Sequence, residues 1–139
     1  MADTKVRSAR DFCSAVPLPY QPRDVVTIAG IQPTDDRLGA TQNDLVCHNP
    51  DGDQPYFDNT KGTIGPYYVS PQAAVALIDS TDASRSRMVP ATVDELRVVL
   101  DKCKQHYPVA PPFSCGPNYY HVDYNSAGLI IRITQLWQS

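Results

Sequence analysis

"YYHVDYNSAGLIIRITQLW" (residues 119–137) contains two runs of β-branched and aromatic residues on either side of the polar stretch "NSAG". Such runs, joined by a short loop that contains glycine, predict an antiparallel hairpin. With a four-residue loop, Val122 faces Ile131 and Tyr120 faces Ile133. These pairs form one apolar face, and a sheet with one apolar face must bury it. The hairpin therefore predicts a domain built around a mainly antiparallel sheet.

The other face of the predicted hairpin is polar. It carries a tyrosine, a histidine, a carboxylate, an arginine and a threonine, namely Tyr119, His121, Asp123, Arg132 and Thr134, with Ile130 as the one apolar exception. In this register His121 stands across from Arg132. Three interpretations remain open: a solvated surface, a surface that binds a partner, and a catalytic face.

Each interpretation of the polar face has its own chemistry. A partner-binding surface would use Tyr119, His121, Asp123 and Arg132 as contact residues. A ribonuclease-type hydrolase would use His121 as acid or base and Arg132 on the phosphate. The sequence contains no nucleophile elbow, phosphate-binding glycine loop or H-E-x-x-H motif. We therefore assign no catalytic, cofactor-binding or metal-binding residue, and we expect no cofactor.

A well-formed helix is predicted over residues 93–106. Thr92 and Glu95 form a T-x-x-E capping box at its start, and Pro108 ends it. Apolar residues then recur at three- and four-residue spacing, at Val93, Leu96, Val99, Leu100 and Cys103. This stripe is expected to face the core, which points Cys103 toward the body of the protein.

The rest of the chain predicts shorter elements. Ser70-Pro71 followed by "QAAVALID" is typical of a capped helix start, so a short helix is expected near 71–79. The expected domains are an irregular proline-rich arm over 1–23 and a single α+β domain over 24–139. Within that domain we expect strands at 24–30, 45–49 and 66–70, with turns over 31–44 and a loop over 50–65.

Four cysteines, at positions 13, 47, 103 and 115, indicate the compartment. Their even number and the lack of a C-x-x-C pair favour two disulfides in a secreted protein over a zinc site. Four cysteines allow three connectivities, of which Cys13–Cys47 and Cys103–Cys115 is the preferred one. No apolar signal-peptide core is present, so a secreted form would already have lost it. The alternative is an intracellular interaction domain with reduced thiols.

Composition limits the class of partner. The formal net charge is −3, and lysine and arginine are not clustered, which argues against DNA or another phosphate backbone as the ligand. No apolar run approaches the roughly 20 residues of a membrane span. With 42% hydrophobic residues the chain can build a core of its own.

"HNPDGDQPYFDN" (residues 48–59) concentrates histidine, aspartate and asparagine in one stretch. Counted from Asp51, an EF-hand would need glycine sixth and glutamate twelfth, but Tyr56 and Gly62 occupy those places. The series Asn-Pro-Asp-Gly at 49–52 is instead typical of a turn. We expect an ordered surface loop, with an irregular calcium site as the alternative.

The run "VDELRVVLDKC…FSCG…YYHVDYNSAGLIIRI", within residues 93–133, resembles small cysteine-stabilised proteins secreted by fungi. These include the killer-toxin-like and the necrosis-inducing effector families. The resemblance implies a secreted fold of sheet and helix that acts by binding something on or in another organism, and it transfers no functional residue. The expected fold is α+β, with a mainly antiparallel sheet, one well-formed helix, one short helix and disulfide staples. The expected function is a secreted, non-enzymatic binding protein such as an effector or toxin. The resemblance implies that its partner is a protein or a cell-surface ligand of another organism.

Overall fold

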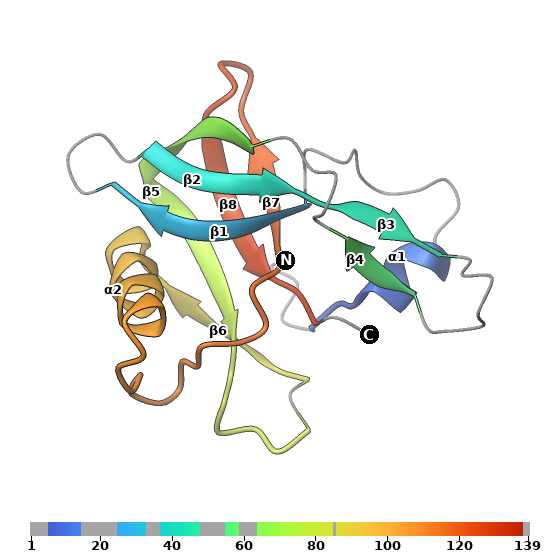
Figure 1. Cartoon of the computed structure of the whole chain (residues 1–139), viewed down its shortest axis with the longest axis vertical. Coiled ribbons are helices and arrows are strands. Elements are labelled where there is room, and N and C mark those ends of the chain that lie inside the picture. Colours follow the sequence, from blue (N-terminus) through green and yellow to red (C-terminus); the bar gives the residue numbers. More distant parts are fainter. Residues whose placement is uncertain are drawn as a thin grey trace.

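A computed structural model describes residues 6–14, 25–32, 37–47, 55–58, 64–84 and 86–137 (Figure 1). The described residues are mostly strand, with two helices. In chain order the elements are α1 (Ala9–Ser14), β1 (Val25–Ile31), β2 (Arg37–Gln42), β3 (Asp44–Val46), β4 (Tyr56–Asp58), β5 (Ile64–Ile78), β6 (Met88–Ala91), α2 (Val93–Lys104), β7 (Tyr120–Tyr124) and β8 (Ile130–Gln135). No helix in these ranges is both long and apolar enough to cross a membrane.

The main sheet closes on itself. Its strand order is β2-β1-β7-β8-β5-β6, and an additional pairing of β2 with β5 joins β1, β2, β5, β7 and β8 into a five-stranded barrel. The described pairings are antiparallel except that of β5 with β8, which run parallel. The expected mainly antiparallel sheet is therefore confirmed in part: it is a closed barrel with one parallel strand pair, and β6 extends it beside β5.

The long strand β5 makes this closure possible, and it corrects the predicted helix near 71–79. Burial alternates along it, with Ala73, Val75 and Leu77 buried and Ala74 exposed, which is the period of a strand. Pro71 lies where the register with β8 shifts between Val69 and Ala74. A strand tolerates proline at such a bulge, since no ladder hydrogen bond is required there. The helix prediction is wrong because the proline marks this bulge.

Helix α2 confirms the prediction from the capping box. The Thr92 hydroxyl accepts a hydrogen bond from the Glu95 amide, and the Glu95 carboxylate accepts one from the Thr92 amide. Leu96 and Leu100 are buried in the barrel core cluster. In Figure 1 the helix lies beside β1 and β5, which it contacts. It ends at Lys104, two residues earlier than expected, and His106 follows with a positive φ of 60°.

Two further predictions are corrected near the N-terminal half of the barrel. Residues 37–42, expected to form turns, make β2, with Leu38 and Ala40 buried between β1 and β5. Residues 56–58, expected to lie in a loop, make β4, which pairs with β3. The strands predicted at 24–30 and 66–70 are confirmed within β1 and β5, and the one at 45–49 is confirmed in part by β3.

The hairpin of β7 and β8 exists, but its register differs from the prediction. Val122 pairs with Ile133 rather than Ile131, and His121 pairs with Thr134 rather than Arg132. Two irregularities cause the shift. The turn closes with a hydrogen bond from the Gly128 amide to the Asn125 carbonyl, and a bulge follows at Ile131 between the Asp123 and Tyr124 pairings.

The turn and the bulge together exchange two isoleucines between faces. Ile130, expected on the polar face, is fully buried, and Ile131, expected on the apolar face, is 42% exposed. The turn and the bulge together shift the register by two residues beyond Ile131. A shift of two keeps each side chain on its face, because side chains alternate with a period of two. The polar face therefore survives for His121, Asp123, Arg132 and Thr134.

Both preferred disulfides are present. Cys13–Cys47 joins α1 to the end of β3, and Cys103–Cys115 joins α2 to the segment before β7. Helix α1 corrects the expectation of an irregular arm for residues 9–14, whereas residues 15–24 lie outside the described ranges. Its Phe12 is buried in a second core cluster with Phe57 and Leu136. A parallel bridge pairs Ser8 with Trp137, so the first and last described segments are neighbours.

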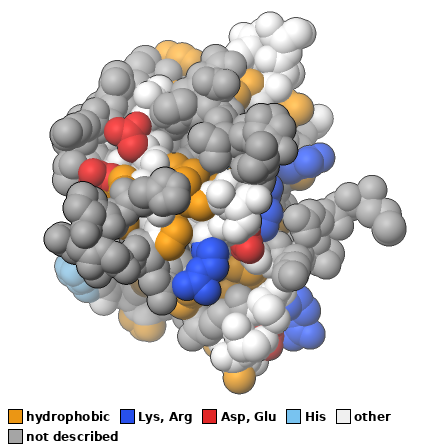
Figure 2. Space-filling model, turned by 90° about the vertical axis from the view of Figure 1, so that its right-hand side faces the viewer, with side chains coloured by type: hydrophobic (Ala, Val, Ile, Leu, Met, Phe, Trp, Pro, Cys, Tyr) orange, Lys and Arg blue, Asp and Glu red, His pale blue; other side chains and the backbone are white. Residues whose placement is uncertain are grey.

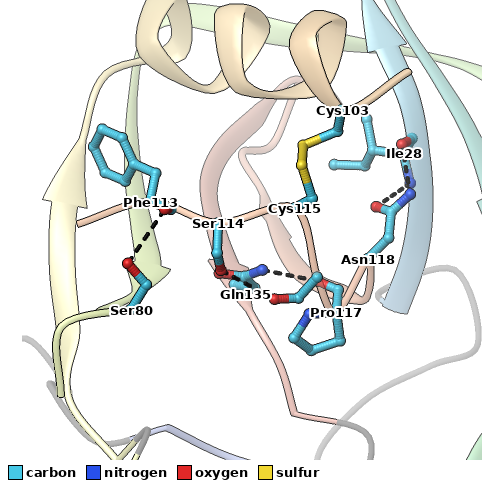
Figure 3. The surroundings of a disulfide bond; sticks show 10 residues. Ile28, Ser80, Cys103, Phe113, Ser114, Cys115, Pro117, Asn118 and Gln135 are labelled. Carbon is cyan, nitrogen blue, oxygen red and sulfur yellow. Dashed lines mark hydrogen bonds between the residues drawn. A yellow bond between two sulfur atoms is a disulfide. The ribbon is translucent and has the colours of Figure 1, made fainter. Parts of the chain in front are cut away.

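Two side-chain amides attach the segment before β7 to the barrel (Figure 3). Asn118 accepts a hydrogen bond from the Ile28 amide and donates one to the Ile28 carbonyl, which completes the ladder of β1. Gln135, only 3% exposed, accepts one from the Ile78 amide and donates one to the Pro117 carbonyl. The segment is therefore held by Cys103–Cys115 and by two amides that act as backbone substitutes.

An ion pair orders the connection between β5 and β6. Asp79, which is buried, accepts hydrogen bonds from the hydroxyl and amide of Thr81 and two from the guanidinium of Arg87. The Thr81 hydroxyl, the Thr81 amide and Arg87 hold the pKa of the Asp79 carboxyl below its usual value. The ionised Asp79 carboxylate thus holds the two ends of this connection together.

Candidate functional site

The polar face of the hairpin forms one wall of a groove of about 510 Å³ on the outside of the barrel. His121 and Asp123 of β7 and Arg132 of β8 line this wall. Met88, Val89 and Pro90 of β6 line the opposite wall. The groove therefore runs over the outer face of four neighbouring strands, β6, β5, β8 and β7.

Small side chains hollow the floor of the groove. Ala74 and Ala76 on β5 point away from the barrel core, and Thr134 lies beside them on β8, since Ala76 and Thr134 are register partners. Larger residues on β6 and β7 rise on both sides. A depression on the outer face of a sheet follows when its central strands carry small side chains and its flanking strands carry large ones.

Asp123 lies between the two other charged or titratable groups of the polar wall. Its Oδ1 is 3.9 Å from Nδ1 of His121, and its Oδ2 is 4.0 Å from a guanidinium nitrogen of Arg132. The exposed fractions of the side chains differ, at 12% for His121, 41% for Asp123 and 65% for Arg132. Arg132 and Asp123 are therefore accessible from the groove, whereas His121 is mostly covered.

The N-terminal segment provides the end of the groove. The Arg7 carbonyl accepts a hydrogen bond from the Trp137 amide, and the Arg7 guanidinium lies over the Phe12 ring at 5.1 Å. The Phe12 ring also packs edge-on against Phe57, with centroids 6.0 Å apart, and stacks with the His121 ring, with centroids 6.1 Å apart. Arg7, Phe12 and His121 thus form a stack that connects α1 to the polar wall, next to the Cys13–Cys47 disulfide.

The structure assembles three of the four candidate contact residues. His121, Asp123 and Arg132 share the groove, but Tyr119 does not line it. The Tyr119 ring instead packs against Phe57 with centroids 5.5 Å apart, in the second core cluster. Tyr119 precedes β7, which begins at Tyr120, so the alternation of the strand does not determine where Tyr119 points.

Sequence reasoning missed Arg7, Ala74 and the β6 wall. Arg7 is more than a hundred positions from the hairpin, and long-range contacts such as the bridge between Ser8 and Trp137 bring it close. Ala74 was assigned to a helix. The alternation of small and larger residues in "AAVAL" was the one local signal for an outward-facing alanine floor.

The acidic stretch at residues 48–59 is described only at Pro55, Tyr56, Phe57 and Asp58. Phe57 is buried and supports the second core cluster. The other positions on which the turn and calcium interpretations depend lie outside the described residues. Among the residues that are described, no group of three or more histidine, cysteine, aspartate or glutamate side chains is placed to hold a metal ion.

The charges of the groove differ from those of the whole chain. Two arginines, Arg7 and Arg132, and one carboxylate, Asp123, line it, whereas the chain has a formal net charge of −3. On the face shown in Figure 2, basic, acidic and hydrophobic side chains lie close together, so neither sign of charge dominates the described surface there. Among the described residues that line it, the groove thus has more basic than acidic side chains, and its floor is apolar.

Comparisons with known proteins find no relative. No protein-family model, curated protein or solved structure significantly matches the chain.

Proposed function

We propose that this protein is an extracellular, non-enzymatic binding protein of the effector or toxin type, and that the groove is its binding site. One observation carries the proposal: a single groove brings together accessible polar groups from β7, β8 and the N-terminal segment over an apolar floor. Concave sites with mostly apolar linings and a few convergent polar groups are the usual form of a binding site.

The two disulfides support the extracellular part of the proposal. Disulfides persist in oxidising compartments and are rare in the cytosol, so Cys13–Cys47 and Cys103–Cys115 are compatible with secretion. Alkylation of the denatured protein without reductant, followed by intact-mass measurement, should add no label. Addition of label to all four cysteines would instead support the intracellular interaction domain with reduced thiols.

Binding fits the groove better than catalysis does. A general acid or base must reach the substrate, yet His121 is only 12% exposed and stacks on Phe12. Hydrolysis of RNA by the ribonuclease mechanism uses a second acid or base. Among the described residues that line the groove, Asp123 is the one carboxylate and His121 the one histidine. Asp123 lies 3.9 Å from Nδ1 of His121 and 4.0 Å from a guanidinium nitrogen of Arg132, so it is an ion-pair partner of Arg132 and makes no hydrogen bond to His121 at Nδ1.

The experiment measures binding of the fluorescently labelled protein to intact bacterial, fungal, plant and animal cells. We expect saturable binding to at least one class of cell. Ala74→Phe should fill the exposed floor and reduce this binding, while Arg10→Ala, an exposed residue outside the groove lining, should not. Circular dichroism and thermal unfolding verify that each variant is folded.

Two outcomes contradict the proposal. If the protein binds no class of cell saturably, or if Ala74→Phe leaves the binding unchanged, the groove is not the binding site. The other outcome is that the purified protein cleaves RNA, with a rate that changes around pH ~6.5, the ordinary pKa of histidine. If His121→Ala abolished this cleavage, the result would support the ribonuclease-type hydrolase that uses His121 and Arg132.

A further inference from the structure

The guanidinium of Arg132 is open to a ligand. Its distance of 4.0 Å from Oδ2 of Asp123 is longer than a hydrogen bond, and 65% of its side chain is exposed. A guanidinium carries five donors in a fixed planar fork that matches a carboxylate or phosphate. Asp123 is close enough to orient this fork but does not saturate it.

The rest of the groove determines which anion fits. Arg7 at the end of the groove adds a second positive charge, while Asp123 prevents the site from becoming uniformly basic. A polyanion such as a nucleic acid is bound by several cations along its backbone. The groove instead contains two arginines, and the carboxylate of Asp123 lies beside one of them, Arg132. This arrangement suits a ligand that bears one isolated negative charge.

An apolar surface lies directly beside Arg132. Ala74, the register partner of Arg132, and Ala76 form the floor, and Met88 and Pro90 form the far wall. Such a surface favours an apolar body, because burying apolar area stabilises a complex in proportion to the area removed from water. The volume of about 510 Å³ falls within the usual range of small-ligand sites. A few residues of an extended chain fill such a groove.

We infer that the groove binds a peptide segment of a partner protein that carries a carboxylate next to an aliphatic side chain. The carboxylate contacts Arg132, and the aliphatic side chain lies over Ala74 and Ala76 against the β6 wall. The inference rests on the proposed function, since it names the chemistry of the partner that occupies the same groove.

The test selects ligands from a random heptapeptide library displayed on phage, with the intact, oxidised protein as bait. The expected consensus contains aspartate or glutamate within one or two positions of leucine, isoleucine, valine or methionine. A synthetic peptide of the consensus should lose roughly ten- to a hundredfold in affinity for Arg132→Ala, the loss expected for a hydrogen-bonded charge. Arg10→Ala, which removes the same charge outside the groove lining, should bind it unchanged.

The remaining outcomes separate this inference from the proposed function. A consensus that lacks an acidic residue but loses binding to Ala74→Phe overturns the inference and leaves the groove as the site. An acidic consensus that binds Arg132→Ala as well as the native protein also overturns it. Absence of any consensus overturns the inference, whereas the cell-binding measurement tests the proposed function separately. Replacing the acidic residue of the consensus peptide by its amide should reproduce the effect of Arg132→Ala.

Discussion

Removal of the Gln135 side chain should destabilise the barrel more than any exposed substitution of the same size. Gln135 accepts from the Ile78 amide at 2.8 Å and donates to the Pro117 carbonyl at 2.7 Å, so it connects β8 to β5 and to the segment before β7. In Gln135→Ala both backbone groups lose their partner. An orphaned buried polar group costs about 1–3 kcal/mol, so the two together cost about 2–6 kcal/mol.

Urea denaturation followed by the fluorescence of Trp137, the single tryptophan, measures this cost. With an m-value of about 1–3 kcal/mol/M, a loss of about 3 kcal/mol lowers the midpoint by roughly 1–3 M. Gln72→Ala is the matched control, since Gln72 is exposed on β5, and it should change stability by less than about 0.5 kcal/mol. Equal stability of the two variants would refute the role of the Gln135 amide as a substitute for backbone pairing.

Four further predictions concern α2, the residue that follows it and the charged turn. Leu100→Ala should lower the free energy of unfolding by about 2–5 kcal/mol, because it leaves a cavity in the core. Thr92→Ala should lower it by about 1 kcal/mol, because the helix loses its cap. If Leu100→Ala is neutral in chemical denaturation, the apolar stripe does not face the core. His106→Gly should raise stability by about 1 kcal/mol, because a φ of 60° strains a residue with a Cβ; an unchanged or lower melting temperature would contradict this. The lowered pKa of Asp79 stabilises the fold above the unfolded-state value of ~3.9, and this stabilisation is lost as the pH falls through the lower folded-state value. Asp79→Asn should therefore be less stable than the native protein at pH 7. The urea midpoints of the two proteins, measured from pH 7 to pH 2, should converge as the pH falls. A difference that stays constant would show that the charge of Asp79 does not cause the loss of stability.

The elements that the sequence predicts best are those specified by local chemistry. The capping box at Thr92 and Glu95 places the start of α2 correctly, because both of its hydrogen bonds form within four residues. The disulfide Cys103–Cys115, which spans 12 positions, also agrees with the preferred pairing, since the stripe that contains Cys103 faces the core. Neither feature depends on the closure of the barrel.

The errors arise where distant segments decide the structure. β2 has few β-branched residues, yet it is a strand because β1 and β5 pair with both of its edges. The segment after Pro71 has good helix formers, but its alternate residues are buried against the barrel core and its edges pair with β6 and β8. Tertiary pairing outweighs such weak local propensity.

The candidate site was half predictable for the same reason. Alternation along β7 places His121 and Asp123 on one face whatever the register, and the two-residue shift keeps Arg132 beside them. The groove itself requires the alanines of β5 and Arg7 of the N-terminal segment, whose positions follow from the parallel pairing and from the bridge to Trp137. Neither the parallel pairing nor the bridge can be inferred from the local sequence.

The bridge between Ser8 and Trp137 also makes the protein suitable for circular permutation, which changes the order of the strands along the chain. Because the first and last described segments pair with each other, a short linker should join Val6 to Trp137, and new ends can be opened at the exposed Ser126–Ala127 turn. The circular permutant keeps the native pairings, but β7 becomes the last strand and β8 the first. Their contact then spans nearly the whole chain, which raises the contact order and should slow folding while leaving the folded barrel unchanged.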